Sequence, residues 1–179
     1  EFGTHLVTIT HRSGFHIEFP ELRREVPLQS LQDYENYIAR LNAFGDYADG
    51  HIALMREGVA QERTLPSVIM QGYEPSIETH VVDDPEKSLL YEPLRDLPEA
   101  FSSSEKEQLQ EAARAAIAGS VVPGYRRFGQ FLKDEYLPNA RRPVGASNLT
   151  AGPDFYRHRV RQVKRHDQQP GAITSTRTG

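Results

Sequence analysis

The chain has 179 residues, of which 37% are hydrophobic and 26% are charged, and its formal net charge is −4. This length accommodates one domain, or a large part of one, with a modest hydrophobic core. The sequence holds no cysteine, which excludes disulfides, zinc–thiolate sites and cysteine nucleophiles. No apolar run approaches the roughly 20 residues that a membrane-spanning helix needs, so we expect a soluble chain without a membrane partner.

The first part of the chain, residues 1–29, is predicted to be an irregular, partly extended arm. Short apolar stretches alternate with polar residues on either side of Gly14, and Gly14 and Pro20 are typical turn residues. Residues 1–4 resemble a cloning remnant. We therefore expect the folded helical domain to begin at residue 30.

Two long segments have the three- and four-residue spacing of amphipathic helices. The first is Leu31–Gly58, which follows Ser30, a residue suited to capping a helix. Gly45 and Gly50 lower the helix propensity of this segment, so we expect them to allow close contact with another helix.

The second long segment, Ser104–Leu137, carries the longest helical pattern in the sequence. Ser104 and Glu107 have the spacing of a capping box at its start. Pro123 interrupts the pattern without changing its phase. We expect a kink there, with helix on both sides and the missing hydrogen bond released near Gly119.

The segments between and after the long helices are less regular. A third helix is expected over Pro66–Glu74, ended or kinked by Pro75 and with Val68, Ile69 and Tyr73 as candidates for burial. Residues 83–98 read as a connector with at most one helical turn, around Ser88–Tyr91. Residues 139–152 are predicted to be loop, 153–164 a final helix, and 166–179 a disordered or foreign tail.

Together these elements predict an all-α fold, an antiparallel helical array joined by short loops. The helical domain would span residues 30–165. The two long helices would pack against each other with a core that includes Tyr34, Ile38, Leu41, Phe128 and Leu132.

Motifs for catalysis are absent or weak. His11 and His16 would lie on opposite faces of an extended arm, and no two histidines have the one-turn spacing of a helical zinc site, so no metal site is predicted. Ser147 lies in a sequence similar to a nucleophile elbow but lacks the preceding strand. The clustered carboxylates are typical of a solvated helix face. We therefore predict no catalytic residue and no cofactor in this chain.

Charge is distributed unevenly. Residues 1–140 hold 13 Lys and Arg against 23 Asp and Glu, whereas residues 141–179 hold 8 against 2. The basic stripe at 157–165 would place Arg157, Arg161 and Lys164 on one helix face, where they could meet nucleic-acid phosphates. Packing on an acidic surface is the preferred interpretation, because no other feature of a nucleic-acid-binding protein accompanies the stripe.

Several stretches between residues 14 and 163 together carry a family resemblance. They are Gly14–His16 with Phe19, Asp33–Leu41, Val122–Phe128 with Phe131 and Leu132, Tyr136–Pro138, and Val144, Gly145, Leu149, Gly152 and Tyr156. In order and spacing they resemble a bacterial family catalogued as domain of unknown function 885. The chain departs from the family pattern at Leu149–Thr150 and after Val163.

The resemblance implies a larger protein than this chain. Members of the family are similar to helical zinc peptidases such as carboxypeptidase Taq and angiotensin-converting enzyme, with an H-E-x-x-H-like motif in the carboxy-terminal half. This chain resembles the amino-terminal helical portion. The resemblance therefore implies zinc in the longer protein and carries no catalytic or metal-binding residue over to this chain.

Two functional hypotheses remain. In the first, the chain is a non-catalytic amino-terminal fragment of a zinc-dependent peptidase or hydrolase, and Arg142 and Tyr156 approach a peptide substrate. In the second, it is a stand-alone helical interaction module, or binds nucleic acid through the 157–165 stripe. Partners would be a second copy of the chain or the missing carboxy-terminal half. The resemblance is bacterial and leaves the compartment open, with export of the longer protein as one option.

Overall fold

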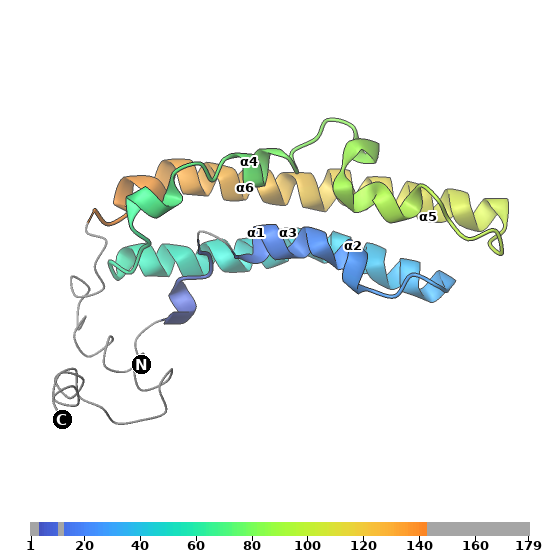
Figure 1. Ribbon diagram of the computed structural model, residues 1–179, viewed down its shortest axis with the longest axis horizontal. Coiled ribbons are helices and arrows are strands. Elements are labelled where there is room, and N and C mark those ends of the chain that lie inside the picture. Colours follow the sequence, from blue (N-terminus) through green and yellow to red (C-terminus); the bar gives the residue numbers. More distant parts are fainter. Residues whose placement is uncertain (1–3, 11–12, 143–179) are drawn as a thin grey trace, which may run out of the picture. The chain divides into compact units, whose positions relative to one another are not determined.

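The computed structural model describes residues 4–10 and 13–142 of the chain (Figure 1). These residues fold as an all-α array, as predicted, and among them no β-strand forms. In chain order the elements are η1 (Thr4–Leu6), α1 (Phe15–Glu18), η2 (Phe19–Glu21), α2 (Leu22–Glu25), α3 (Leu31–Ala60), η3 (Ser67–Met70), α4 (Pro75–Glu78), η4 (Pro85–Lys87), η5 (Leu89–Leu94), α5 (Ser103–Ala116), η6 (Ile117–Val121), α6 (Val122–Phe131), η7 (Leu132–Tyr136) and η8 (Leu137–Asn139). Here η6 and η7 are π-helical and the other η elements are 3₁₀-helical.

Helix α3 begins where its sequence predicts. The Ser30 hydroxyl accepts a hydrogen bond from the backbone N–H of Asp33, and the Asp33 carboxylate accepts one from the backbone N–H of Ser30. These reciprocal bonds satisfy two amides that the first helical turn leaves free. The helix continues to Ala60, two residues beyond the predicted end at Gly58.

The long carboxy-terminal helix starts two residues earlier than predicted. Ser102 and Glu105, rather than Ser104 and Glu107, form the capping box. The two pairs have the same spacing, so the sequence pattern alone did not distinguish them. The choice follows from Phe101, which packs edge-on against Tyr34 of α3 with ring centroids 5.7 Å apart and so places the helix start directly after itself.

The chain stays helical on both sides of Pro123, as predicted. The π-helical turn η6 ends two residues before the proline and contains Gly119, the residue at which the disruption is predicted. Proline has no N–H to donate to the carbonyl four residues earlier, and a widened turn is one way in which a helix accommodates that loss. Helical turns therefore continue from Ser103 to Asn139.

The two long helices run parallel, so the predicted antiparallel arrangement is wrong. The Gly45 N–H donates to Ser120 Oγ at 2.9 Å, and further along both helices Arg56 pairs with Glu135. Partners on both helices therefore advance in the same direction along the chain. Figure 1 shows the same course, with α3 and the α5–α6 helix both running from right to left as the sequence proceeds.

A long return segment, residues 61–102, makes this parallel pairing possible. It leaves the end of α3, where the Thr64 hydroxyl donates to the carbonyl of Asn139, and it ends where Phe101 meets Tyr34. It thus runs back along the full length of both helices (Figure 1). The prediction assumed short loops, which make successive helices antiparallel; this segment is instead a crossover connection.

Two predictions for the return segment are wrong. The expected helix over 66–74 is only the short η3, with Val68 52% exposed, and Pro75 begins α4 instead of ending a helix. Proline is well tolerated in the first helical turn, because its missing N–H has no partner there in any case. The connector at 83–98 contains two helical elements, η4 and η5, because Leu90 and Leu94 are fully buried and draw the chain onto the core.

Residues 15–25 of the amino-terminal arm are helical, where an irregular and partly extended chain was predicted. These residues form α1, η2 and α2, and among the described residues of the arm a bridge-like pairing joins Ile9 and Gly14. Gly14 has φ 151°, and a Cβ there would lie 2.9 Å from the side chain of Ile9, so glycine suits this turn. Phe15 and Phe19, one helical turn apart, are both buried. Their burial explains why the segment coils instead of extending.

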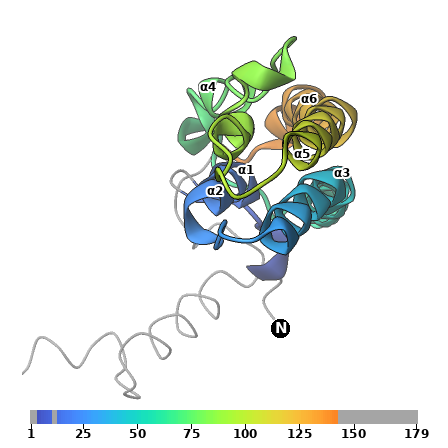
Figure 2. The ribbon, with the colours of Figure 1, turned by 90° about the vertical axis from the view of Figure 1, so that its right-hand side faces the viewer.

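The predicted core is confirmed. Tyr34, Ile38, Leu41, Phe128 and Leu132 are all buried, with at most 6% of each exposed. Figure 2 looks along the long helices and shows α3 with the α5–α6 helix on one side and the α1–α2 arm on another. The predicted final helix at 153–164, the tail at 166–179 and most of the loop at 139–152 lie outside the described residues.

Candidate functional site

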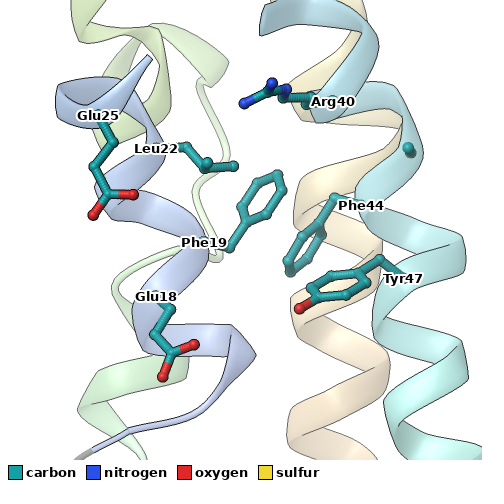
Figure 3. A pocket seen from close by; sticks show the side chains of 8 residues that line it. Glu18, Phe19, Leu22, Glu25, Arg40, Phe44 and Tyr47 are labelled. Carbon is teal, nitrogen blue, oxygen red and sulfur yellow. The ribbon is translucent and has the colours of Figure 1, made fainter.

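A pocket of about 390 Å³ lies between the arm and α3 (Figure 3). We call it the arm pocket. Its lining residues are Glu18, Phe19, Leu22, Glu25, Arg40, Ala43, Phe44 and Tyr47.

The arm pocket has an apolar floor and charged edges. Phe19 and Phe44 form the floor, with ring centroids 4.4 Å apart, and Tyr47 lies beside them with 49% of its surface exposed. Figure 3 shows Glu25 on the arm side and Arg40 on the α3 side. Neither of these two charges has an ion-pair partner within the described part of the chain. The pocket therefore suits an apolar side chain with polar groups around it.

A second, larger hollow of about 610 Å³ lies between α4 and α6, and we call it the α4–α6 groove. Its lining residues are Tyr73, Glu74, Ile77, Glu78, Val81, Tyr125, Arg126, Gly129, Gln130, Lys133 and Leu137.

The two walls of the α4–α6 groove carry opposite charges. The wall formed by α4 and the residue before it presents the carboxylates of Glu74 and Glu78, and the wall formed by α6 and η7 presents the cations of Arg126 and Lys133. Arg126 is 3.9 Å from an oxygen of Asp83, a long and exposed contact, and the other three charges form no ion pair within the described residues. The groove can therefore bind a ligand that carries both signs of charge around an apolar centre.

Two buried histidines contact Tyr125, one of the residues that line this groove. His16 on α1 is 4% exposed and His80, after α4, is 6% exposed. The ring of His80 stacks on Tyr125 with centroids 4.5 Å apart, and the Tyr125 hydroxyl donates to the backbone oxygen of His16 at 2.9 Å. Neither histidine has a hydrogen-bond partner at Nδ1. The arm and the return segment thus meet at Tyr125.

Burial holds both imidazoles in the neutral state. It lowers the pKa of His16 from 6.5 to about 4, and the neighbouring His80 lowers it further. Burial also lowers the pKa of His80 to about 4, with the positive charge of Arg23 adding to the effect. A charged imidazole is disfavoured in an apolar site and near another cation. At neutral pH the pair is uncharged and supports packing rather than proton transfer.

The residues predicted to bind substrate are not brought together in the described structure. Arg142 is exposed at the end of the described chain, and Tyr156, Ser147, His11 and the basic stripe at 157–165 lie outside it. Its neighbour Arg141 anchors this end, because the Arg141 Nε donates to the Thr64 carbonyl at 2.9 Å. The proposed role of Arg142 and Tyr156 stays a prediction.

Sequence reasoning missed both hollows. Their residues come from elements that are distant in sequence, and the arm was expected to be extended. The spacing of Phe15 and Phe19 was the available signal, since residues four apart share a helix face. Among residues 4–10 and 13–142, no three His, Asp or Glu side chains gather so as to hold a metal ion, and no helix is long and apolar enough to cross a membrane.

Comparisons place this chain among bacterial proteins. The family described as "Bacterial protein of unknown function (DUF885)" matches residues 3–176. No curated protein matches the chain. A crystal structure described as "the putative lipoprotein from Colwellia psychrerythraea" aligns with a TM-score of 0.82 and 19% sequence identity, over 92% of this chain and 28% of that chain. The likeness shows a shared fold, and this chain spans 28% of the length of that protein.

Proposed function

This chain belongs to the bacterial family of unknown function DUF885, and we propose that it is the non-catalytic amino-terminal helical region of a longer zinc-dependent peptidase or related hydrolase. The coverage carries the proposal, because the shared fold takes in 92% of this chain but 28% of the Colwellia protein. A catalytic zinc site needs three protein ligands, which we place in the remainder of the longer protein. We also propose export of that protein, since the Colwellia protein is described as a "putative lipoprotein".

Within the longer protein, the α4–α6 groove would form part of the wall of the substrate cleft. A peptide offers an amino end, a carboxyl end and apolar side chains between them. The groove offers Glu74 and Glu78 on one wall, Arg126 and Lys133 on the other, and Ile77 between them. Complementary charges on opposite walls would orient a peptide as well as attract it. This arrangement supports a binding role for these residues and no chemical one.

The first test is the natural reading frame downstream of this chain. We expect it to encode an H-E-x-x-H motif, in which two histidines one turn apart bind zinc and the glutamate acts as general base. The longer protein should hydrolyse peptides and lose that activity on chelation. A frame without such a motif would overturn the peptidase proposal, and so would chelator-resistant peptide hydrolysis by the 179-residue chain alone.

The second test addresses the groove in the longer protein. Lys133→Glu should raise KM for peptides about tenfold and change kcat little, because the residue contributes to binding and stays away from the reacting bond. Lys87→Glu is the matched control, since Lys87 is exposed on η4 and outside the groove. Equal KM values for the two variants would remove the groove from the substrate site.

The alternative function is that of a helical interaction module. The arm pocket favours it, because an apolar hollow beside the half-exposed ring of Tyr47 suits a protein partner. If the downstream frame lacks zinc-ligand motifs, this alternative takes the place of the peptidase proposal.

A further inference from the structure

One exposed face of α3 carries a regular heptad pattern. Its residues alternate between spacings of three and four, and all of them are exposed. We call this face the α3 seam; it consists of Arg40, Ala43, Tyr47, Gly50, Leu54 and Glu57. Tyr47 is 49% exposed and Leu54 is 36% exposed, which is unusual for large apolar side chains at heptad positions. The buried face of α3 packs within the described fold, so the seam is a separate, exposed surface of the helix.

The seam is complementary to itself when reversed. If a second α3 is laid antiparallel with Tyr47 facing Gly50, then Ala43 faces Leu54 and Arg40 faces Glu57. Each layer thus joins a large residue to a small one, or a cation to an anion. Antiparallel helices pair their two kinds of heptad position in just this way. The two copies are related by a two-fold axis that passes between Tyr47 and Gly50, so each of these residue pairs occurs twice in the dimer.

We propose that two copies of this chain associate through their α3 seams, antiparallel and in the register that pairs Tyr47 with Gly50. The environment of Gly50 agrees with this register. No atom lies within 4 Å of the place that a Cβ at Gly50 would occupy, so the partner's Tyr47 ring has open space there. The absence of a side chain lets two helix backbones approach closely.

The same register fills the arm pocket. The partner's Leu54 faces Ala43, which lines that pocket together with Phe19, Leu22 and Phe44. The pocket is apolar at its floor and large enough for a leucine side chain. Each copy would therefore insert Leu54 between the arm and α3 of the other. The partner's Leu54 would thus occupy the arm pocket, which no side chain of the described chain fills.

Charge excludes the parallel alternative. In a parallel pair, Arg40 would face the partner's Arg40 and Glu57 the partner's Glu57, two like-charge layers at the ends of the seam. Arg40 forms no ion pair within the described residues, and the Glu57 carboxylate accepts a hydrogen bond from the side-chain amide of Gln61 at 2.9 Å. Both remain accessible to a partner. The antiparallel register pairs each of these charges with an opposite charge, whereas the parallel register places each beside a like charge.

Charge reversal tests the proposal in the 179-residue chain. Arg40→Glu places a glutamate opposite the partner's Glu57 in two layers, and Glu57→Arg places two arginines opposite each other twice. Each variant should raise the dimer dissociation constant about 100-fold, measured by analytical ultracentrifugation. An equimolar mixture of the two variants should restore dimerisation, because every layer then pairs a cation with an anion. The double variant Arg40→Glu/Glu57→Arg should also dimerise.

The proposal fails if the wild-type chain is monomeric at all accessible concentrations, or if the single variants dimerise as the wild type does. It also fails if an equimolar mixture of the two single variants does not restore dimerisation. Val68→Asp, at a 52% exposed position outside α3, is the control and should dimerise normally. Circular dichroism of every variant must match the wild type, which exposed substitutions on α3 should allow.

Cysteine pairing tests the register. The 179-residue chain has no cysteine, so single substitutions give unambiguous cross-links. A mixture of Ala43→Cys and Leu54→Cys should form a heterodimeric disulfide, since these positions share a layer. Ala43→Cys alone should not, because about 16 Å would separate the two copies of that position along the seam, beyond the roughly 7 Å reach of a disulfide. Efficient cross-linking of Ala43→Cys alone would instead indicate the parallel arrangement and overturn the proposal.

Discussion

Two of the contacts that helix α3 makes within the described part of the chain differ in chemistry. Against the long helix it packs small residues: a Cβ at Gly124 would lie 2.9 Å from the Phe44 ring, and Ser120 accepts the N–H of Gly45. Against the arm it packs rings, with Phe15 stacked on His51 at 4.4 Å. The first contact depends on close backbone approach, and the second depends on aromatic and imidazole rings that remain uncharged.

Because of this difference, we expect the stability of the two contacts to depend differently on pH. The contact with the long helix contains no buried titratable pair, and its ion pairs, such as Arg127 with Asp49, are partly exposed. The arm carries His16, whose ring packs on Phe128 of α6 and whose backbone oxygen accepts the Tyr125 hydroxyl, and the ring of His80 stacks on Tyr125. Both histidines are buried and unpaired at Nδ1. We therefore expect the arm to be the acid-sensitive part of the fold and α3 with the long helix to be the stable part.

The largest loss of stability is expected from a substitution in the core between α3 and the long helix. Leu132 is 1% exposed in the core, and Leu132→Ala should lower the free energy of unfolding by about 2–5 kcal/mol, because it removes apolar contacts and leaves a cavity. Urea unfolding measures the change. Leu89→Ala is the control at a 43% exposed position and should cost less than about 0.5 kcal/mol. Similar losses for both variants would show that Leu132 is not a core residue.

The second prediction concerns acid and the arm. The pKa of each buried imidazole is lowered from 6.5 to about 4, so the folded state binds fewer protons than the unfolded state between these values. The stability that depends on neutral His16 and His80 is complete above pH 6.5 and is lost as the pH falls towards 4. The loss should amount to roughly 3 kcal/mol for each imidazole at most. Unfolding by urea at a series of pH values measures it.

Substitution of one histidine sharpens this test. His80→Phe keeps an apolar ring against Tyr125 and removes one titrating group, so its stability should fall less steeply between pH 6.5 and 4. Val68→Phe is the control, because it lies at a 52% exposed position and changes no titrating group. If His80→Phe retains the full slope of the wild type, the acid sensitivity does not come from this pair.

The smallest effect concerns the hydrogen bonds between the long helices. The Ser120 hydroxyl donates to the Asn42 carbonyl at 2.7 Å and accepts from the Gly45 N–H at 2.9 Å. Ser120→Ala should therefore cost about 1 kcal/mol, with no change in pH dependence. Thermal unfolding at pH 7 and pH 5 checks both statements. Ser104→Ala, at an exposed position on α5, is the control and should hardly change the free energy of unfolding. If Ser120→Ala changes it as little, these hydrogen bonds add nothing to stability.

Local patterns predicted the long helices well and their boundaries less well. Ser30 with Asp33 caps α3 as its residue type suggests, whereas two overlapping serine–glutamate pairs competed at the start of α5. The contact of Phe101 with Tyr34 decided between them. A cap is a local interaction, but the choice between two equivalent caps depends on which one lets the neighbouring ring reach the core.

The two glycines of α3 show the same limit. Both were expected to allow close helix contact, and this holds at Gly45, where a Cβ would lie 3.1 Å from Ser120 Oγ. At Gly50 the prediction is wrong within the described chain, because nothing lies within 4 Å. The sequence shows that a glycine is present but not which helix face it occupies relative to its neighbours, since that depends on the packing of the whole array.

By itself, the sequence determined that this chain is all-α, where its two long helices lie and which residues form its core. These features follow from periodicity, caps and the burial of apolar side chains, which act over a few helical turns. Only the tertiary structure decided that the long helices run parallel, that the arm coils onto α3 and that two hollows form. Those outcomes depend on the path of residues 61–102 along both helices and on contacts between residues distant in sequence, which no local pattern encodes.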